Sequence, residues 1–126
     1  MEIEITATYA AAIGILTAGL GFATVIKRAK TGISWGDGGD FGLQRAIRAH
    51  GNLTEYAPVF LIILFLLENA GASATWLHGL GVAFVFGRLV SALYFWVAQK
   101  FILRVIALWG AVLPIIVGSV VLLIGT

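Results

Sequence analysis

Long apolar stretches separated by short polar segments make up most of the chain. Residues 5–26 and 105–125 contain no charged side chain. At about 1.5 Å per helical residue, each stretch is long enough to cross the roughly 30 Å hydrocarbon core of a bilayer. Two further apolar segments, 44–69 and 75–98, carry a few charges. The pattern therefore predicts four transmembrane helices.

The link at 70–74 joins the second and third predicted helices through only five residues. Gly71 suits the end of one helix, and Ser73 or Thr75 suits the N-cap of the next. A link this short makes consecutive helices antiparallel. We therefore expect an all-α, integral-membrane four-helix bundle with up-down topology, formed by a single domain over residues 1–126.

Composition supports a membrane protein and excludes several classes of function. The chain is 60% apolar and 11% charged, whereas a soluble domain has about a quarter of its residues charged. It contains no cysteine, which excludes disulfides, thiolate metal sites and a cysteine nucleophile. The net charge of +2 rests on too few basic residues for a phosphate-binding surface, so no nucleic-acid partner is expected.

The basic residues are distributed on one side of the predicted membrane. Seven of the eight flank the first and third connections, and none flanks the 70–74 link. By the positive-inside rule, these two connections are cytoplasmic, and both termini lie outside. The seven residues are Lys27, Arg28, Lys30, Arg45, Arg48, Lys100 and Arg104.

A polar stripe interrupts the second predicted helix. Its members, Arg45, Arg48, Asn52 and Glu55, follow steps of three, four and three residues. At about 100° per residue they share a face about 80° wide. Tyr56 borders this face. An ionised carboxylate at membrane depth needs a cationic or hydrogen-bonding partner.

Arg88 in the third predicted helix lies at a similar depth, so we expect a Glu55–Arg88 ion pair. Such a pair alone could be architectural and fix the helix register. The whole stripe instead indicates a polar pocket open to the cytoplasm. Guanidinium groups suit carboxylates, and a carboxylate suits an ammonium group. A zwitterionic ligand with more than one carboxylate, such as a small peptide, would satisfy both.

The two histidines do not predict a metal site. His50 projects off the stripe, toward another helix or another subunit, and a structural role is its default interpretation. His78 lies near the outer end of the third predicted helix and is expected to be an interfacial residue. Because the two lie on opposite sides of the membrane, they cannot share a metal ion.

The segment from Arg48 to Pro58, Arg-Ala-His-Gly-Asn-Leu-Thr-Glu-Tyr-Ala-Pro, resembles the second-helix signature of the MAPEG family, membrane-associated proteins in eicosanoid and glutathione metabolism. The segment Gly87-Arg88-Leu89 resembles a second landmark of that family. The resemblance covers essentially the whole chain and is closest to bacterial members. It implies a homotrimer in the bacterial inner membrane, with glutathione bound at each subunit interface near the cytoplasmic side.

The resemblance also implies roles for individual residues. A glutamate at the position of Glu55 would bind the amino group of glutathione, and an arginine at Arg48 would bind a carboxylate. His50 and Arg28 would approach the peptide from the neighbouring subunit. The implied glutathione-binding set is Arg48, Asn52, Glu55, Tyr56, Arg88, His50, Arg28 and Ser91.

Catalysis in the family's glutathione transferases uses an arginine that stabilises the glutathione thiolate. Without gaps, that position falls nearest Ile102, so Arg104, two residues away, is the candidate catalytic residue if the local helix phase differs. Phe95 stands where the family's enzymes often have a phenol, although Ser91 could still donate a hydrogen bond.

The expected function is that of a membrane-bound glutathione-dependent transferase or peroxidase acting on lipophilic electrophiles or hydroperoxides, with glutathione as co-substrate and no metal. Phe95 and the displaced Arg104 favour an alternative, a non-catalytic membrane binding or scaffold protein of the same fold. The buried charges suggest a third class, an ion or proton pathway, but they stop near mid-membrane. The expected partners are glutathione, a lipophilic small molecule, membrane lipid and further copies of the chain.

Overall fold

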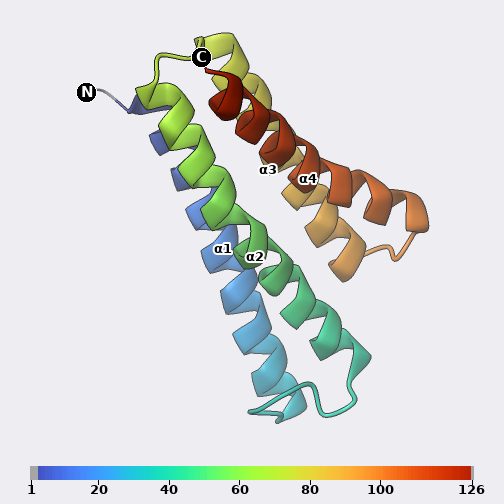
Figure 1. Ribbon diagram of the computed structural model, residues 1–126. Coiled ribbons are helices and arrows are strands. Elements are labelled where there is room, and N and C mark those ends of the chain that lie inside the picture. Colours follow the sequence, from blue (N-terminus) through green and yellow to red (C-terminus); the bar gives the residue numbers. More distant parts are fainter. Residues whose placement is uncertain (1–2, 126) are drawn as a thin grey trace.

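The computed structural model describes residues 3–125 as four α-helices (Figure 1). They are α1 (Glu4–Thr31), α2 (Phe41–Asn69), α3 (Ala74–Trp96) and α4 (Phe101–Ile124). Each is long and apolar enough to cross a membrane. The predicted all-α four-helix bundle is confirmed. The ends of the predicted domain, residues 1–2 and 126, lie outside the described part of the chain.

Three of the helices extend past the ends predicted from charge. α1 continues five residues beyond position 26 to Thr31, and its C-cap is Gly32, which has φ of +73° and donates its N–H to the Arg28 carbonyl. α2 begins at Phe41, where the Asp40 side chain accepts the Leu43 N–H at 2.7 Å. α4 begins four residues before position 105. Lysine and arginine favour helices, so a charge marks the edge of the apolar segment and not the end of the helix.

The tight link between α2 and α3 has the capping chemistry that the sequence predicts. Gly71 has φ of +87°, a left-handed conformation that favours glycine. Ser73 is the N-cap of α3, and its hydroxyl accepts the Trp76 N–H at 3.4 Å. The link therefore reverses the chain and places α3 beside α2.

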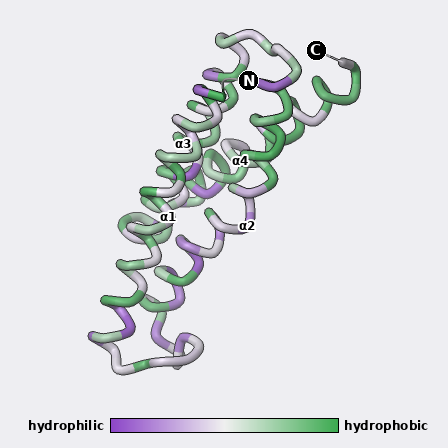
Figure 2. Tube along the Cα trace, turned by 90° about the vertical axis from the view of Figure 1, so that its left-hand side faces the viewer, coloured by the Kyte–Doolittle hydropathy of each residue, from purple (hydrophilic) through white to green (hydrophobic). Residues whose placement is uncertain are grey.

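The bundle consists of an α1–α2 hairpin packed against an α3–α4 hairpin. The start of α1, the end of α4 and the α2–α3 link lie at one end of the molecule, and at the other end α1 and α2 extend beyond the α3–α4 connection (Figure 1). Hydrophilic residues gather around the α1–α2 connection, whereas the helices are mainly hydrophobic (Figure 2). The α1–α2 connection therefore forms a polar end on a largely apolar molecule.

Helix α2 contributes most of the core and packs against all three other helices. Its Phe60 stacks on Phe84 of α3 with ring centroids 4.1 Å apart, and both side chains are fully buried. Backbone contact holds α3 to α4, because a Cβ on Gly87 would lie 2.6 Å from the Gly110 Cα. Since lipid is as apolar as the core, close packing of this kind stabilises the bundle more than burial from water does.

A polar cluster that the sequence did not predict joins the helix ends opposite the basic connections. The Glu68 carboxylate of α2 accepts the backbone N–H groups of Ile5 and Thr6, at 2.9 and 2.6 Å, and the Thr6 hydroxyl. Nearby, the Tyr9 hydroxyl lies 2.9 Å from His78 Nδ1. Glu68 thus caps a helix that lies more than 60 positions earlier in the chain, and His78 has a hydrogen-bonding partner within the bundle.

Candidate functional site

A pocket of about 340 Å³ lies between α2 and the ends of α3 and α4 that adjoin their connection. It has a substantial polar lining, in contrast with the other cavities found between the described helices. Its lining residues are Arg48, Asn52, Tyr56, Arg88, Ser91, Tyr94, Phe95, Arg104, Ala107 and Leu108.

Helix α2 contributes three polar residues to the pocket at intervals of four. Arg48, Asn52 and Tyr56 lie one above the other, because residues four apart share a helical face. Of the predicted stripe, Arg45 and Glu55 do not line the pocket. The pocket lining therefore includes Arg48 and Asn52 of the stripe and the bordering Tyr56.

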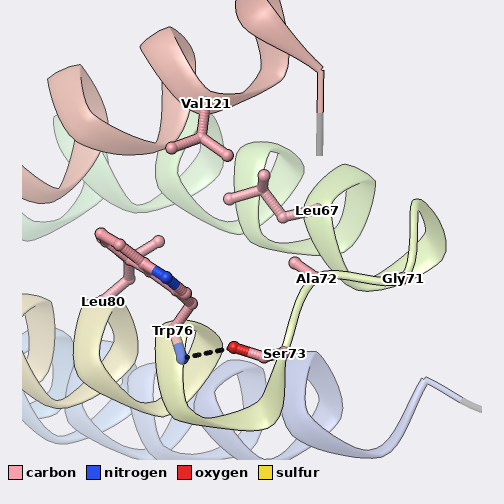
Figure 3. A pocket seen from close by; sticks show the side chains of 7 residues that line it. All are labelled: Leu67, Gly71, Ala72, Ser73, Trp76, Leu80 and Val121. Atoms are coloured by element: carbon pink, nitrogen blue, oxygen red, sulfur yellow. Dashed lines mark hydrogen bonds between the residues drawn. The ribbon is translucent and has the colours of Figure 1, made fainter.

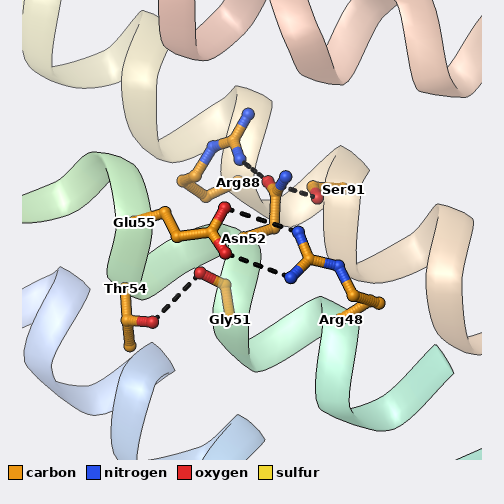
Figure 4. Close-up of polar contacts among 7 residues, drawn as sticks. All are labelled: Arg48, Gly51, Asn52, Thr54, Glu55, Arg88 and Ser91. Carbon is orange, nitrogen blue, oxygen red and sulfur yellow. Dashed lines mark hydrogen bonds and ion pairs between the residues drawn. The ribbon is translucent and has the colours of Figure 1, made fainter. Parts of the chain in front are cut away.

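Arg88 is the buried centre of the site, with 2% of its surface exposed. Its Nη1 donates to Asn52 Oδ1 (Figure 4). Its Nη2 donates to the Ala107 carbonyl. Ser91 also donates to Asn52 Oδ1, at 3.1 Å. The guanidinium carbon lies 5.3 Å from the centroid of the Tyr56 ring, within cation–π distance. Neutral groups of α2 and α4 thus hold this cation of α3.

The predicted Glu55–Arg88 ion pair is wrong. Glu55 instead pairs with Arg48, seven residues earlier on the same helix, through Nη1–Oε1 and Nη2–Oε2 distances of 3.0 and 3.4 Å. About half of each side chain is exposed. The long arginine side chain spans two helical turns along the surface, whereas the shorter Asn52 projects toward α3. Figure 4 shows the Arg48–Glu55 pair separate from the Arg88–Asn52 contact.

Arg104 reaches the same pocket from the first turn of α4. Its guanidinium carbon lies 5.9 Å from the centroid of the Tyr94 ring. Because α4 begins at Phe101, Arg104 lies on a regular helix four residues past Lys100, its N-cap. The two-residue displacement inferred from linear spacing therefore does not keep Arg104 away from Arg48 and Arg88.

The pocket carries more positive than negative charge. Within residues 3–125, the Arg48–Glu55 pair is the ion pair found, and neither Arg88 nor Arg104 has a carboxylate within 4 Å. The Arg88 Nε is buried without a hydrogen-bonding partner. No cluster of metal-ligating residues occurs in this part of the chain. The pocket is thus suited to a ligand with more than one anionic group.

Comparison with known proteins identifies the family. A model of the MAPEG family matches residues 6–124. The chain belongs to the MAPEG family. Two curated relatives, both called "Inner membrane protein YecN" and from Escherichia coli strains K12 and CFT073, are 35% identical to this MAPEG chain over 86 residues. The match covers 68% of the chain and 66% of each relative, slightly under two thirds of their length.

No solved structure matches the chain. The four apolar helices and the inner-membrane relatives together support a multi-pass protein of the inner membrane.

Besides Glu55, two of the residues that the MAPEG resemblance associates with glutathione, His50 and Arg28, lie outside the pocket. His50 packs against α1, where a Cβ on Gly21 would lie 3.3 Å from its Nε2. Arg28 donates to the carbonyls of Ile33 and Gly36, at 3.3 and 2.8 Å, and so holds the α1–α2 connection. Within this MAPEG chain, the pocket is therefore built from α2, α3 and α4.

Sequence reasoning missed two parts of the site. The Ala107 carbonyl accepts from Arg88, but any residue has a carbonyl, so no sequence signal marks it. Tyr94 is not among the residues predicted to bind the ligand, yet it lines the pocket beside Arg104. The signal available for Tyr94 was its spacing of three from Ser91, which places both residues near one face of α3.

Proposed function

We propose that this MAPEG protein binds glutathione in the pocket and activates its thiol for reaction with lipophilic electrophiles or hydroperoxides. The observation that carries the proposal is the presence of two guanidinium groups, on Arg88 and Arg104, without a carboxylate partner in the described chain. Glutathione has two carboxylates, one ammonium group and a thiol. Its charges complement the surplus of cations in the pocket.

The Arg48–Glu55 pair offers the complementary groups for the zwitterionic end of glutathione. In the free subunit these two side chains satisfy each other at 3.0 Å and are half exposed. A bound amino-acid group would replace the internal pair with two new pairs, its carboxylate on Arg48 and its ammonium group on Glu55. The exchange replaces one ion pair with two, whereas a ligand without the ammonium group would leave Glu55 unpaired and bind more weakly.

Arg104 is proposed as the catalytic residue. A cation beside a thiol favours the thiolate, which is the nucleophilic form. The thiolate sulfur would attack an electrophilic carbon and displace the leaving group. Alternatively it would attack a hydroperoxide oxygen, breaking the O–O bond to release the alcohol and leave glutathione sulfenic acid, which a second glutathione converts to the disulfide and water. The lipophilic substrate would reach the sulfur from the surrounding bilayer.

The decisive experiment follows the glutathione thiolate by ultraviolet absorbance in the detergent-solubilised protein at neutral pH. We expect a thiolate signal with the wild-type protein and its loss in Arg104→Ala, together with at least a tenfold fall in conjugation of an aromatic halide. Arg45→Ala is the matched control, because Arg45 lies on the same polar stripe but does not line the pocket. Absence of calorimetric binding to folded wild-type protein would refute the proposal.

One observation favours a second candidate, a non-catalytic binding or scaffold protein. Phe95 lines the pocket with a ring that has no hydroxyl group. The other argument for this alternative, the displacement of Arg104, is weakened by the position of that residue in the pocket. Glutathione binding without a thiolate signal or turnover would support the second candidate.

The assembly and orientation of the protein are part of the same proposal. In a homotrimer, Arg28 and His50 would approach the pocket of the neighbouring subunit. The basic α1–α2 and α3–α4 connections would face the cytoplasm, and both termini would lie on the opposite side. The pocket, close to the α3–α4 connection, would then receive glutathione from the cytoplasm.

A further inference from the structure

Two apolar cavities lie in line along the seam between α3 and α4, away from the polar pocket. The first, of about 280 Å³, adjoins the α2–α3 link, and the second, of about 400 Å³, extends toward the middle of α4. Both are lined by Trp76 and Leu80, so they adjoin each other across these side chains. We call the two cavities together the α3–α4 groove.

The crossing of the two helices explains why this space exists. Gly87 and Gly110 bring α3 and α4 into backbone contact near the polar pocket. From that contact the seam continues toward the α2–α3 link, where its lining includes the small residues Ala83 and Ala72. Figure 3 shows the Trp76 ring beside Leu80, with Val121 and Leu67 across the cavity. The side chains of the seam therefore leave part of it unfilled.

The chemistry of the α3–α4 groove selects an apolar occupant. No charged residue lines either cavity, and the Ser73 hydroxyl already accepts the Trp76 N–H. The floor includes the buried Leu80, whereas the rims include Trp76 and Trp109, which are more than half exposed. Since α3 and α4 are apolar enough to span a membrane, the rims face hydrocarbon.

The dimensions favour a hydrocarbon chain over a helix of a second copy. Val121 and Ile106 mark the ends of the groove on α4 and lie fifteen residues apart, or about 22 Å. That length covers the roughly 15 Å depth of one bilayer leaflet. Cavities of about 280 and about 400 Å³ over this length give a mean cross-section of about 30 Å², against about 80 Å² for a helix about 10 Å across.

We propose that the α3–α4 groove is a binding site for one acyl chain of a membrane phospholipid, from the leaflet nearest the α2–α3 link. The chain lies along the seam against Leu80 and bends past the Trp76 indole. The headgroup remains at the link, outside the apolar lining. The site is distinct from the glutathione pocket, because no residue lines both the groove and that pocket.

Tryptophan quenching tests the site in the full chain in detergent, with phosphatidylcholine brominated at mid-chain as the probe. Trp35→Phe and Trp96→Phe leave Trp76 and Trp109, both in the groove, as reporters. We expect quenching that saturates near one lipid per chain and is reversed by unbrominated lipid. Ala83→Phe, which fills the second cavity, should weaken binding at least fivefold, and Ala72→Leu in the first cavity is a second filling variant.

The matched control is Ala11→Phe, an exposed alanine on α1 that lines none of the cavities, and it should bind lipid like the parent. Circular dichroism establishes that each variant is folded. Quenching that rises with lipid fraction without saturating, equally in all variants, would overturn the proposal and indicate bulk lipid contact. Absence of quenching, with a smaller assembly of Ala83→Phe by light scattering, would also overturn it and indicate a contact between copies.

Discussion

Arg88 is a buried cation held by neutral acceptors. Asn52 Oδ1 and the Ala107 carbonyl accept hydrogen bonds from its two Nη groups, and its guanidinium carbon lies over the Tyr56 ring. Dipoles of this kind orient a cation without neutralising it, whereas a carboxylate would cancel most of its field. The positive charge of Arg88 therefore remains available to an anionic ligand in the pocket.

Removing the Asn52 amide should destabilise the protein, because it leaves part of a buried guanidinium and the Ser91 hydroxyl without their acceptor. We expect Asn52→Ala to lower the free energy of unfolding by about 1–2 kcal/mol, near the upper end of measured hydrogen bonds in membranes. Denaturant unfolding in detergent measures this change. Asn69→Ala, at the exposed end of α2, is the control and should have little effect. Equal stability of the two variants would contradict the assigned role of Asn52.

At the scale of the helices, two sets of contacts fix the positions of α1, α3 and α4. Glu68 satisfies N–H groups at the start of α1, which otherwise have no partner within the helix. Gly87 and Gly110 allow α3 and α4 to touch through their backbones one residue from Arg88. The Gly87–Gly110 contact brings α4, with its Ala107 carbonyl, within hydrogen-bonding distance of the Arg88 guanidinium.

The cap on α1 predicts a local effect of Glu68→Ala. Loss of the carboxylate should expose the Ile5 and Thr6 amides and cost about 1 kcal/mol, the usual value of an N-cap. Hydrogen exchange followed by mass spectrometry should show faster exchange in the first turn of α1. Glu68→Gln keeps an acceptor oxygen and should give an intermediate rate. Unchanged exchange in Glu68→Ala would show that the cap does not hold α1.

The glycine contact predicts that Gly110→Ala forces α3 and α4 apart, since its Cβ would lie 2.5 Å from the Gly87 Cα. We expect a loss of about 1–3 kcal/mol in stability, as for other overpacked contacts. Glutathione affinity should fall as well, because Arg88 would lose Ala107. Gly79→Ala, where a Cβ has open space, should be neutral or stabilising. Thermal unfolding and calorimetry of both variants test the contact, and a Gly110→Ala protein as stable as Gly79→Ala would argue against it.

For the whole molecule, the face formed by α1 and α2 is the surface on which the proposed homotrimer can be tested. A shallow apolar cavity of about 420 Å³ on this face is lined by small residues including Ala10, Gly14 and Ala18. A Cβ on Gly14 would meet no atom of its own subunit. Small residues allow helices of different subunits to approach closely in a membrane.

We therefore expect Gly14→Leu to lower the fraction of trimer while leaving the subunit fold intact. Light scattering in detergent measures the mass, and circular dichroism measures the helix content. Gly79→Leu is the control, because Gly79 also has open space but lies on α3. Trimers of equal stability in both variants would exclude this face as the subunit contact.

Much of the fold follows from the sequence, because uncharged runs of more than 20 residues have few structural solutions in a membrane. Helix ends are harder to predict. A lysine or arginine marks where the chain leaves the hydrocarbon, but the helical backbone can continue past it. For this reason the predicted start of α4 was four residues too late, and the face of α4 on which Arg104 lies was not predicted. Helix periodicity also placed Arg48, Asn52 and Tyr56 near one face of α2 correctly.

The partner of each polar side chain was less predictable. Helix periodicity predicts the direction in which a side chain leaves the helix axis but not which neighbour it contacts. It therefore could not predict that Glu55 pairs with Arg48 of the same helix. The role of Glu68 was missed, although topology contained a signal: α1 begins and α2 ends on the same side, and a helix start needs acceptors. Pairing therefore depends on side-chain length and tertiary position together.

The tight turn between α2 and α3 also constrains how the chain enters the bilayer during synthesis. A central arginine on an isolated helix costs about 2.5–3.5 kcal/mol to insert. Asn52 is synthesised before Arg88, and the short link allows both helices to leave the translocon as a pair with the amide already facing the guanidinium. The Ala107 carbonyl on α4 arrives last. Biogenesis can therefore proceed in chain order without presenting an unpaired arginine to lipid.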